Sequence, residues 1–127
     1  MELRLPRLTI RSWQAGDAPS LAPLADNRAI WRNLRDRFPH PYHLEDAQAF
    51  IARSLERDPQ VHYAITLDGA ARGSSGIRPG EDIYRRSAEF GYWLGEPYWG
   101  RGYATEAVGA FTDWVFGRFD LVRLYAM

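Results

Sequence analysis

The chain has 127 residues, enough for one domain with a buried core, and its hydrophobic and charged fractions of 46% and 25% are those of an ordinary globular protein. Its formal net charge is zero, which argues against binding nucleic acid or an anionic membrane through charge. Cysteine is absent, so disulfides, thiolate metal sites and cysteine nucleophiles are excluded. We expect a single domain over residues 1–127.

All 16 basic residues are arginine, which codon bias explains better than function does. The absence of lysine excludes Schiff-base chemistry and a P-loop phosphate lysine. Residues 1–13 alternate charged and apolar side chains, so they predict no signal peptide, and no segment is long and apolar enough to span a membrane. We therefore expect a cytoplasmic protein.

The first half of the sequence predicts one strand followed by helices. Leu8–Trp13 is typical of a strand, and Asp17 is expected to cap the helix that follows. A short helical piece is expected at Ala29–Leu34, before the prolines within Phe38–Tyr42 interrupt it. A strong helical pattern then covers Leu44–Arg57.

The second half predicts a hairpin and then a strand–helix–strand unit. The expected elements are a strand at Val61–Leu67, a tight turn at Asp68–Gly69, a returning strand at Ala71–Ile77, a strand at Ser87–Leu94, a helix at Gly102–Phe116 closed by Gly117 at its C′ position, and a strand at Leu121–Ala126. This order predicts an α/β (α+β) fold, in which helices flank a mixed and twisted sheet.

A glycine-containing turn separates the strand at Ser87–Leu94 from the helix that follows. It leaves unpaired backbone N–H groups at the positive end of a helix dipole, which favours an anion, most often a phosphate. The spacing Gly100-x-Gly102-x-x-Thr105 resembles a dinucleotide fingerprint. That alternative is disfavoured because the third glycine is missing and the unit follows an antiparallel hairpin.

Other candidate constellations favour structural roles. His40 and His43 could form half of a metal site, but no third ligand stands at a suitable spacing, so loop histidines are favoured and no metal is expected. His62 is expected at a half-buried core edge. The aromatic residues of 92–103 could stack on bases, but zero net charge favours packing and no nucleic-acid partner.

The segment Tyr98-Trp-Gly-Arg-Gly-Tyr-Ala-Thr-Glu-Ala107, preceded by Ala88-Glu-Phe-Gly-Tyr-Trp-Leu94, resembles the acetyl-CoA loop of the GNAT superfamily of N-acetyltransferases. More narrowly, it is similar to the branch of ribosomal-protein N-terminal (Rim-type) enzymes. The Pro39–Tyr42 turn, the Asp68–Gly69 hairpin and Val122–Ala126 fit in order, so the resemblance covers essentially the whole chain. It implies a GNAT-like, mostly antiparallel sheet and acetyl-CoA as the acetyl donor, with no metal.

The resemblance also implies which residues bind acetyl-CoA. The backbone amides of Gly100–Ala104 would hold the pyrophosphate, and the backbone of Trp93 and Leu94 would bind the pantetheine arm. Pro97 stands where the family usually has Gln or Arg, which weakens a side-chain role there but leaves the backbone contacts intact. The expected cofactor-binding residues are Trp93, Leu94, Trp99, Gly100, Arg101, Gly102, Tyr103, Ala104 and Thr105.

The chemistry implied is attack of a neutral amine on the thioester. The N–H of Leu94 would stabilise the oxyanion, and Glu89 is the candidate general base, directly or through water. Glu89 is equally well explained as a surface carboxylate paired with Arg85 or Arg86. The acceptor entrance would be lined by Phe38, Tyr42 and His43, and the acceptor would be a protein N-terminal α-amine or a small-molecule amine.

Family members continue beyond the position of Met127 with a helix and two strands, and that part often supplies a hydroxyl acid for the leaving thiolate. We therefore expect a C-terminally truncated domain whose edge at Leu124–Met127 is unpaired unless a second copy covers it in a homodimer. The leading hypothesis is an acetyl-CoA-dependent N-acetyltransferase. The alternatives are a catalytically impaired acyl-CoA-binding or oligomerising remnant of that fold, and a plain interaction domain.

Overall fold

One mixed sheet forms the centre of the protein. The computed structural model describes residues 2–27, 41–57, 60–79, 87–118 and 123–126. At positions 78–79, 87–90, 118 and 123–126 it describes the backbone alone. Its strands, paired in sequence order, are β1 (Glu2–Arg4), β2 (Thr9–Arg11), β3 (His62–Leu67), β4 (Ala70–Pro79), β5 (Ser87–Leu94) and β6 (Arg123–Ala126). Neighbouring strands are antiparallel except β5 and β6, which are parallel. The expectation of a mixed, mostly antiparallel sheet is confirmed.

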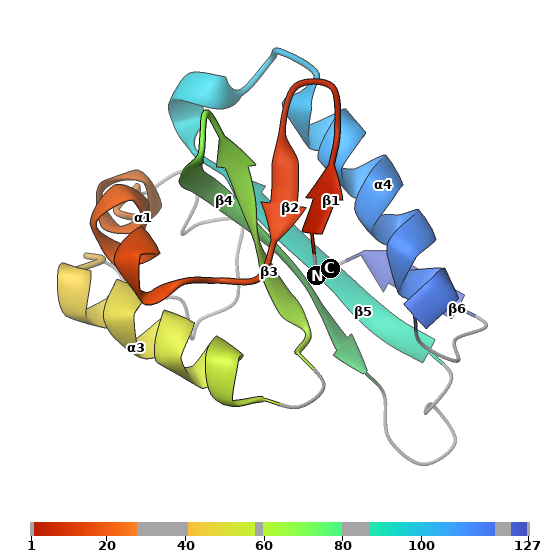
Figure 1. Cartoon of the computed structure of the whole chain (residues 1–127), viewed down its shortest axis with the longest axis horizontal. Helices are drawn as coiled ribbons and strands as arrows, with labels where there is room; N and C mark the ends of the chain where they lie inside the picture. Colours follow the sequence, from red (N-terminus) through yellow and green to blue (C-terminus); the bar gives the residue numbers. More distant parts are fainter. Residues whose placement is uncertain (1, 28–40, 58–59, 80–86, 119–122, 127) are drawn as a thin grey trace.

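Helices cover both faces of this sheet (Figure 1). The helices α1 (Ala18–Ala25) and α3 (Leu44–Glu56) pack on one face, and α4 (Tyr103–Arg118) packs on the other. Two short 3-10 turns, η1 (Ala15–Asp17) and η3 (Glu96–Tyr98), precede α1 and α4. The helical piece expected at 29–34 lies outside the described residues, and the interruption expected at 38–42 lies mostly outside them. No described helix is long and apolar enough to cross a lipid bilayer.

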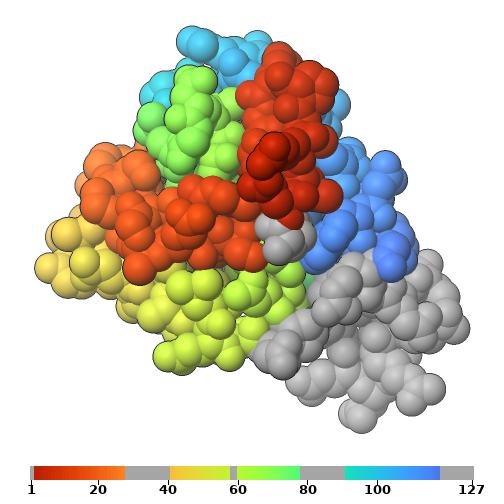
Figure 2. All heavy atoms as spheres, viewed as in Figure 1, coloured from red at the N-terminus to blue at the C-terminus, as the bar shows by residue number. Residues whose placement is uncertain are grey.

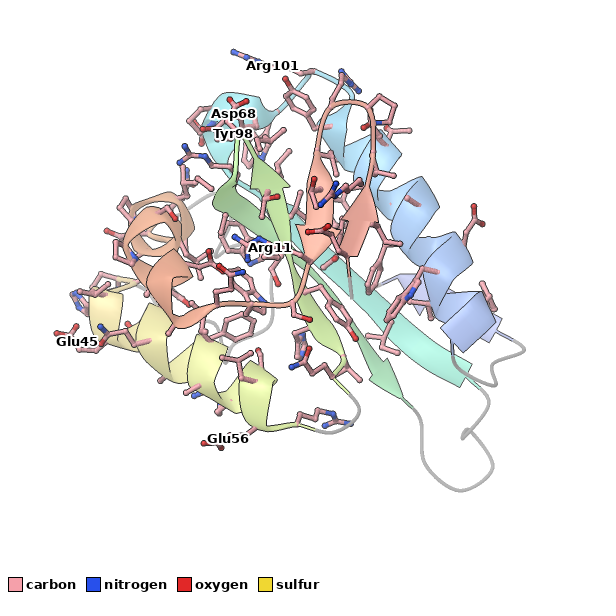
Figure 3. The ribbon with its side chains drawn as sticks, viewed as in Figure 1. Arg11, Glu45, Glu56, Asp68, Tyr98 and Arg101 are labelled. Atoms are coloured by element: carbon pink, nitrogen blue, oxygen red, sulfur yellow. The ribbon has the colours of Figure 1, made fainter. Side chains whose placement is uncertain are left out.

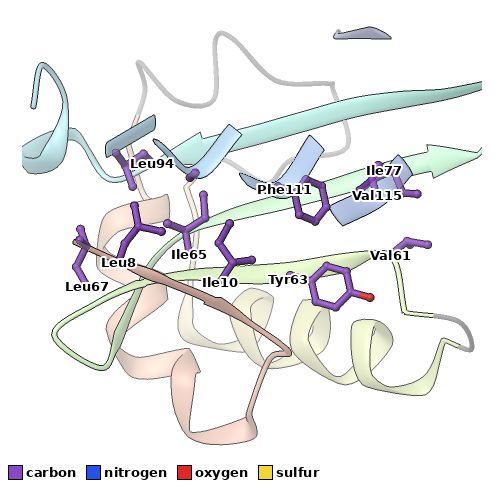
Figure 4. Close-up of a cluster of buried hydrophobic side chains, with 11 residues drawn as sticks. Leu8, Ile10, Val61, Tyr63, Ile65, Leu67, Ile77, Leu94, Phe111 and Val115 are labelled. Atoms are coloured by element: carbon purple, nitrogen blue, oxygen red, sulfur yellow. The ribbon is translucent and has the colours of Figure 1, made fainter. Parts of the chain in front are cut away.

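Side-chain alternation along β3 divides the core into two clusters. Tyr63 and Ile65 point toward α4 and pack with Phe111 and Val115, as Figure 4 shows. Ala64, one position along, belongs to the cluster under α1 and α3. A strand buried on both faces carries apolar side chains on both, because successive residues point to opposite sides. On α4 the buried side chains are Ala107, Phe111 and Val115, and Trp114 packs at the margin of this cluster.

The hairpin predicted at Asp68–Gly69 is confirmed. Asp68 and Gly69 have φ values of 55° and 81°, the left-handed pair that a two-residue hairpin turn requires. Past the turn, Ile65 pairs with Gly73 while Thr66 pairs with Ala71, so Arg72 is an extra residue in β4. Such a β-bulge bends the strand locally. The bend lies beside the end of β5, because the Arg72 carbonyl accepts a hydrogen bond from the N–H of Gly95 at 2.8 Å.

Three local features differ from what the sequence predicts. The strand β1 was not expected, since three residues carry almost no periodic signal. Asp17 precedes α1 as predicted, but its carboxylate makes no capping hydrogen bond to the helix; it is bound by Arg11 and by the N–H of Gln14 instead. Gly117 does not end α4 as a C′ residue, because the helix continues through it to Arg118 without a left-handed turn.

Candidate active site

The loop between η3 and α4 contains two glycines in a left-handed conformation. Gly100 has φ 75° and Gly102 has φ 79°, a region that other L-residues enter only with strain. A Cβ added at Gly100 would meet no atom within 4 Å, so the space beside that residue is open to a ligand. The backbone therefore needs glycine at both positions, and this explains the spacing of the motif.

The same loop presents a row of backbone amides without partners. The N–H of Glu106 donates to the carbonyl of Gly102 at 3.1 Å, the first hydrogen bond of the helical ladder. Helical geometry leaves the N–H groups just before it without a partner. Across the part of the chain that the structure describes, no hydrogen bond uses the N–H groups of residues 100–105. We call these six amides the amide cradle. They lie at the positive end of the α4 dipole, an arrangement that binds phosphate groups.

The end of β5 offers a second backbone donor. Gly95 gives its N–H to β4, and since N–H groups alternate in direction along an antiparallel strand, the N–H of Leu94 points the other way. On that side β6 pairs only with residues 87–90 of β5. Residues 91–94 pair with β4 on their other side, and within the described residues no strand pairs with them on the β6 side. This one-sided edge ends at Leu94, and η3 connects it to the loop that carries the cradle.

Trp99 ties the strand end to the loop. Its indole Nε1–H donates to the Leu94 carbonyl at 2.7 Å, while 44% of the residue stays exposed. Leu94 itself is 3% exposed, because its side chain packs in the core under α4. The carbonyl of Leu94 is thus bound within the protein, and its N–H is the group left on the open side. Trp93 lies on the opposite face, against the cluster under α1 and α3.

The other predicted site residues lie in different surroundings. Arg101 is exposed, and its side chain points away from the body of the protein at the top of Figure 3. Tyr103 and Ala104 are half-buried at the start of α4, and Thr105 is exposed. Glu89 pairs through its backbone with Arg78 on β4 and Tyr125 on β6, and its side chain lies outside what is described. Phe38 lies outside the described residues.

Position 89 is five residues before Leu94 on the same strand. At a rise of roughly 3.4 Å per residue, the two Cα atoms are about 17 Å apart, and odd and even positions face opposite sides of the sheet. The backbone therefore places position 89 away from the Leu94 N–H. The role expected for Glu89 as a general base, directly or through water, stays a prediction.

The two described entrance candidates differ in exposure. Burial raises the pKa of Tyr42 to about 12, with the nearby Asp46 carboxylate acting in the same direction, so the phenol stays protonated at neutral pH. The ring is 6% exposed and packs in the cluster under α1 and α3. His43 is exposed just before α3, and its N–H donates to Asp46 Oδ2 at 2.8 Å. Tyr42 thus contributes mainly packing, whereas His43 is open to solvent.

Sequence reasoning missed Arg7 as part of this site. Its guanidinium reaches from the loop after β1 to α4, where Nε donates to Glu106 Oε1 at 2.8 Å and Nη1 donates to the Arg101 carbonyl at 2.7 Å. Glu106 lies in the first turn of α4, where the helix dipole favours a carboxylate, and it also pairs with Arg7. Arg7 and Glu106 are 99 positions apart, so no local pattern relates them.

Comparison with known proteins identifies the family. A family model described as an acetyltransferase (GNAT) domain matches residues 7–127. The chain therefore belongs to the GNAT acetyltransferase family, and the resemblance noted in the sequence is confirmed. Enzymes of this family use acetyl-CoA as the acetyl donor. In the described part of the chain, no group of three or more His, Cys, Asp or Glu side chains is placed to hold a metal ion.

Solved structures share the fold. The chain is similar to a GNAT-family acetyltransferase from Bacillus anthracis, with a TM-score of 0.81 and 20% identity over 99% of this chain and 72% of that one. It is similar to RimL, a ribosomal L7/L12 alpha-N-protein acetyltransferase in complex with coenzyme A, with a TM-score of 0.82 and 21% identity over 99% of this chain and 73% of that one. It is also similar to a ribosomal-protein-S5-alanine acetyltransferase from Vibrio fischeri, with a TM-score of 0.81 and 18% identity over 99% of this chain and 73% of that one.

Proposed function

We propose that this chain transfers the acetyl group of acetyl-CoA to a primary amine. The observation that carries the proposal is that the amide cradle follows the open edge of β5 with only η3 between them, and that the Leu94 N–H on this edge has no strand partner among the described residues. The cradle suits a pyrophosphate, and the open edge suits the extended pantetheine arm. An acyl-CoA has both groups, because its pantetheine arm extends from its pyrophosphate.

The reaction balances with the groups that the site offers. The lone pair of the amine forms an N–C bond to the thioester carbonyl, whose oxygen becomes an oxyanion beside the Leu94 N–H. The C–S bond then breaks, the thiolate takes up a proton, and the nitrogen releases one. Glu89 would accept that proton, directly or through water. An α-amine, with a reference pKa of roughly 8, needs less help than a lysine amine near 10.4.

We propose a protein N-terminal α-amine as the acceptor. The support is the likeness to RimL and to the ribosomal-protein-S5-alanine acetyltransferase, whose names state N-terminal or alanine acetylation. A peptide with a free N-terminus and no lysine should be acetylated faster than the same peptide with a blocked N-terminus and one internal lysine.

Calorimetry with acetyl-CoA, followed by a thiol-release assay with the free peptide, tests the proposal. Saturable binding with release of one thiol per acetylated peptide is expected. Binding without thiol release would favour an acyl-CoA-binding remnant, and no binding would favour a plain interaction domain.

A matched pair of glycine variants locates the site. In Gly102→Val the residue must adopt φ 79°, and a Cβ would lie 3.1 Å from Nη2 of Arg7, so the cradle should distort and binding should be lost. Gly109→Ala adds a Cβ on the exposed side of α4 with no atom within 4 Å, so binding should be unchanged. Equal affinity in the two variants would place the acyl-CoA elsewhere.

A further inference from the structure

One arginine contacts three residues in and beside the amide cradle at once. Besides its bonds to Glu106 Oε1 and to the Arg101 carbonyl, Arg7 donates its own backbone N–H to Glu106 Oε2 at 3.1 Å. Its guanidinium carbon also lies 4.7 Å from the ring centre of Tyr103. Arg101 belongs to the loop, and Tyr103 and Glu106 belong to the first turn of α4. The β1–β2 hairpin is thereby joined to the cradle, and Figure 2 shows the two regions side by side at the top of the view.

These contacts constrain the loop that carries the amide cradle. The loop is built around two left-handed glycines, which on their own permit many backbone conformations. A guanidinium is a planar fork with fixed donor directions, so binding a carboxylate and a carbonyl together fixes their relative positions. A Cβ at Gly102 would be 3.1 Å from Nη2, which shows that the guanidinium packs directly on the loop.

Arg7 also controls the charge beside the cradle. The hydrogen bond from Arg7 holds the pKa of Glu106 below its ordinary value, so this carboxylate is ionised at neutral pH. The helix dipole would favour an unpaired carboxylate in the first turn of α4, but that carboxylate would repel a phosphate bound at the same amides. The guanidinium at 2.8 Å offsets that negative charge.

We propose that Arg7 is a positioning residue of the amide cradle. It keeps the Arg101 carbonyl and the Glu106 carboxylate in place, so that the amides of residues 102–105 point toward the ligand phosphates, and it cancels the charge of Glu106. Only the identity of the ligand rests on the proposed function. The constraint on the loop can be measured without any ligand.

Trypsin measures the constraint directly, because the peptide bond after Arg101 contains the carbonyl that Arg7 binds. In Arg7→Ala the fragment ending at Arg101 should form faster, by about tenfold, the size expected when a charge-assisted hydrogen bond is lost. Cleavage after Arg53 within α3 is the internal reference for global unfolding and should change less. Arg4→Ala is the control, since Arg4 pairs with Glu2 on the same hairpin at 2.7 Å with 82% of its side chain exposed.

Binding gives the second measurement. In Arg7→Ala the Kd for coenzyme A and the KM for acetyl-CoA should rise by about tenfold, while kcat at saturating acetyl-CoA stays within about twofold because Leu94 is not touched by Arg7. Arg4→Ala should match the wild type. If Arg7→Ala does not fold, Arg7→Lys keeps the charge but cannot bind both partners as a planar fork, and the same changes should appear at smaller size.

Two results would overturn the proposal: equal rates of cleavage at Arg101 in Arg7→Ala and wild type relative to Arg53, or an unchanged Kd in a folded variant. Failure of the wild type to bind coenzyme A would refute the proposed function instead. In that case the cleavage rates alone decide whether Arg7 holds the loop.

Discussion

The ion pair between Arg11 and Asp17 is the least exposed one that the described residues form. Nη1 of Arg11 donates to Oδ2 of Asp17 and Nη2 donates to Oδ1, both at 2.8 Å, so the pair is bidentate. The N–H of Gln14 donates to the same Oδ2 at 2.8 Å. Asp17 is 6% exposed, and the hydrogen bonds that Arg11 donates to its carboxylate raise the pKa of Arg11 against the opposing effect of burial.

Replacing Arg11 by methionine should destabilise the protein strongly. Arg11→Met keeps an unbranched side chain but leaves the Asp17 carboxylate buried with one donor, and breaking a buried pair in this way costs about 3–5 kcal/mol. With about 2.1 cal/mol/K of unfolding entropy per residue, a chain of 127 residues has about 0.27 kcal/mol/K in total. The midpoint of thermal unfolding should therefore fall by about 11–19 °C.

Circular dichroism during heating, with urea titration for the free energy of unfolding, measures the effect. The double variant Arg11→Met/Asp17→Leu should recover part of the loss, because it removes the buried charge along with its partner. Arg4→Ala, which breaks an exposed pair, should change stability by less than about 1 kcal/mol. The reasoning is refuted if Arg11→Met loses less than about 1 kcal/mol, or if the double variant is no more stable than the single one.

Three further changes test the core and the sheet. Burial, and secondarily the charges of Arg57 and Arg53, lower the pKa of His62 from 6.5, so the unfolded chain binds a proton before the folded protein does. The free energy of unfolding should be unaffected by this group above pH 6.5 and should decline as the pH falls below that value toward the lowered pKa. Urea titrations of His62→Gln should show a smaller decline with falling pH, and an equal decline in variant and wild type would contradict this role of His62. In Gly73→Ala the new Cβ would lie 2.3 Å from the Trp93 carbonyl oxygen, so β4 and β5 must separate, at about 1–3 kcal/mol, and an unchanged urea midpoint would contradict this. Phe111→Ala should cost about 3–5 kcal/mol because the ring is fully buried under α4; a loss below about 2 kcal/mol in calorimetry would show that the cavity collapses.

The elements with strong local signals were predictable from the sequence. The strand β5 and the start of α3 were placed correctly, because alternation over Ser87–Leu94 and acidic residues after His43 are unambiguous patterns. The turn at Asp68–Gly69 was equally clear, since this dipeptide suits two successive left-handed residues. The family and the two cradle glycines followed from the same stretch of sequence.

The missed features depend on contacts between distant residues. Asp17 has the chemistry of a helix cap, but Arg11 binds its carboxylate once β2 lies beside η1. The sequence alone does not show which arginine pairs with Asp17. The pairing of Arg7 with Glu106 has the same origin. Gly117 suits either a C′ position or a helix interior, and nothing nearby decides between them. The homodimer expected at the β6 edge stays a prediction, which sedimentation would measure.

The strict sequence order of the sheet has a consequence for how the protein assembles. The β3–β4 hairpin closes through a two-residue turn, whereas β2 joins β3 across a contact that spans 57 positions, from Thr9 to Thr66. Closing a longer loop costs more chain entropy, so local pairings tend to form first. We expect the central hairpin to nucleate folding and the N-terminal hairpin to dock late. The loop that would bind phosphate would then reach its final shape only after Arg7 arrives, in one of the last steps of folding.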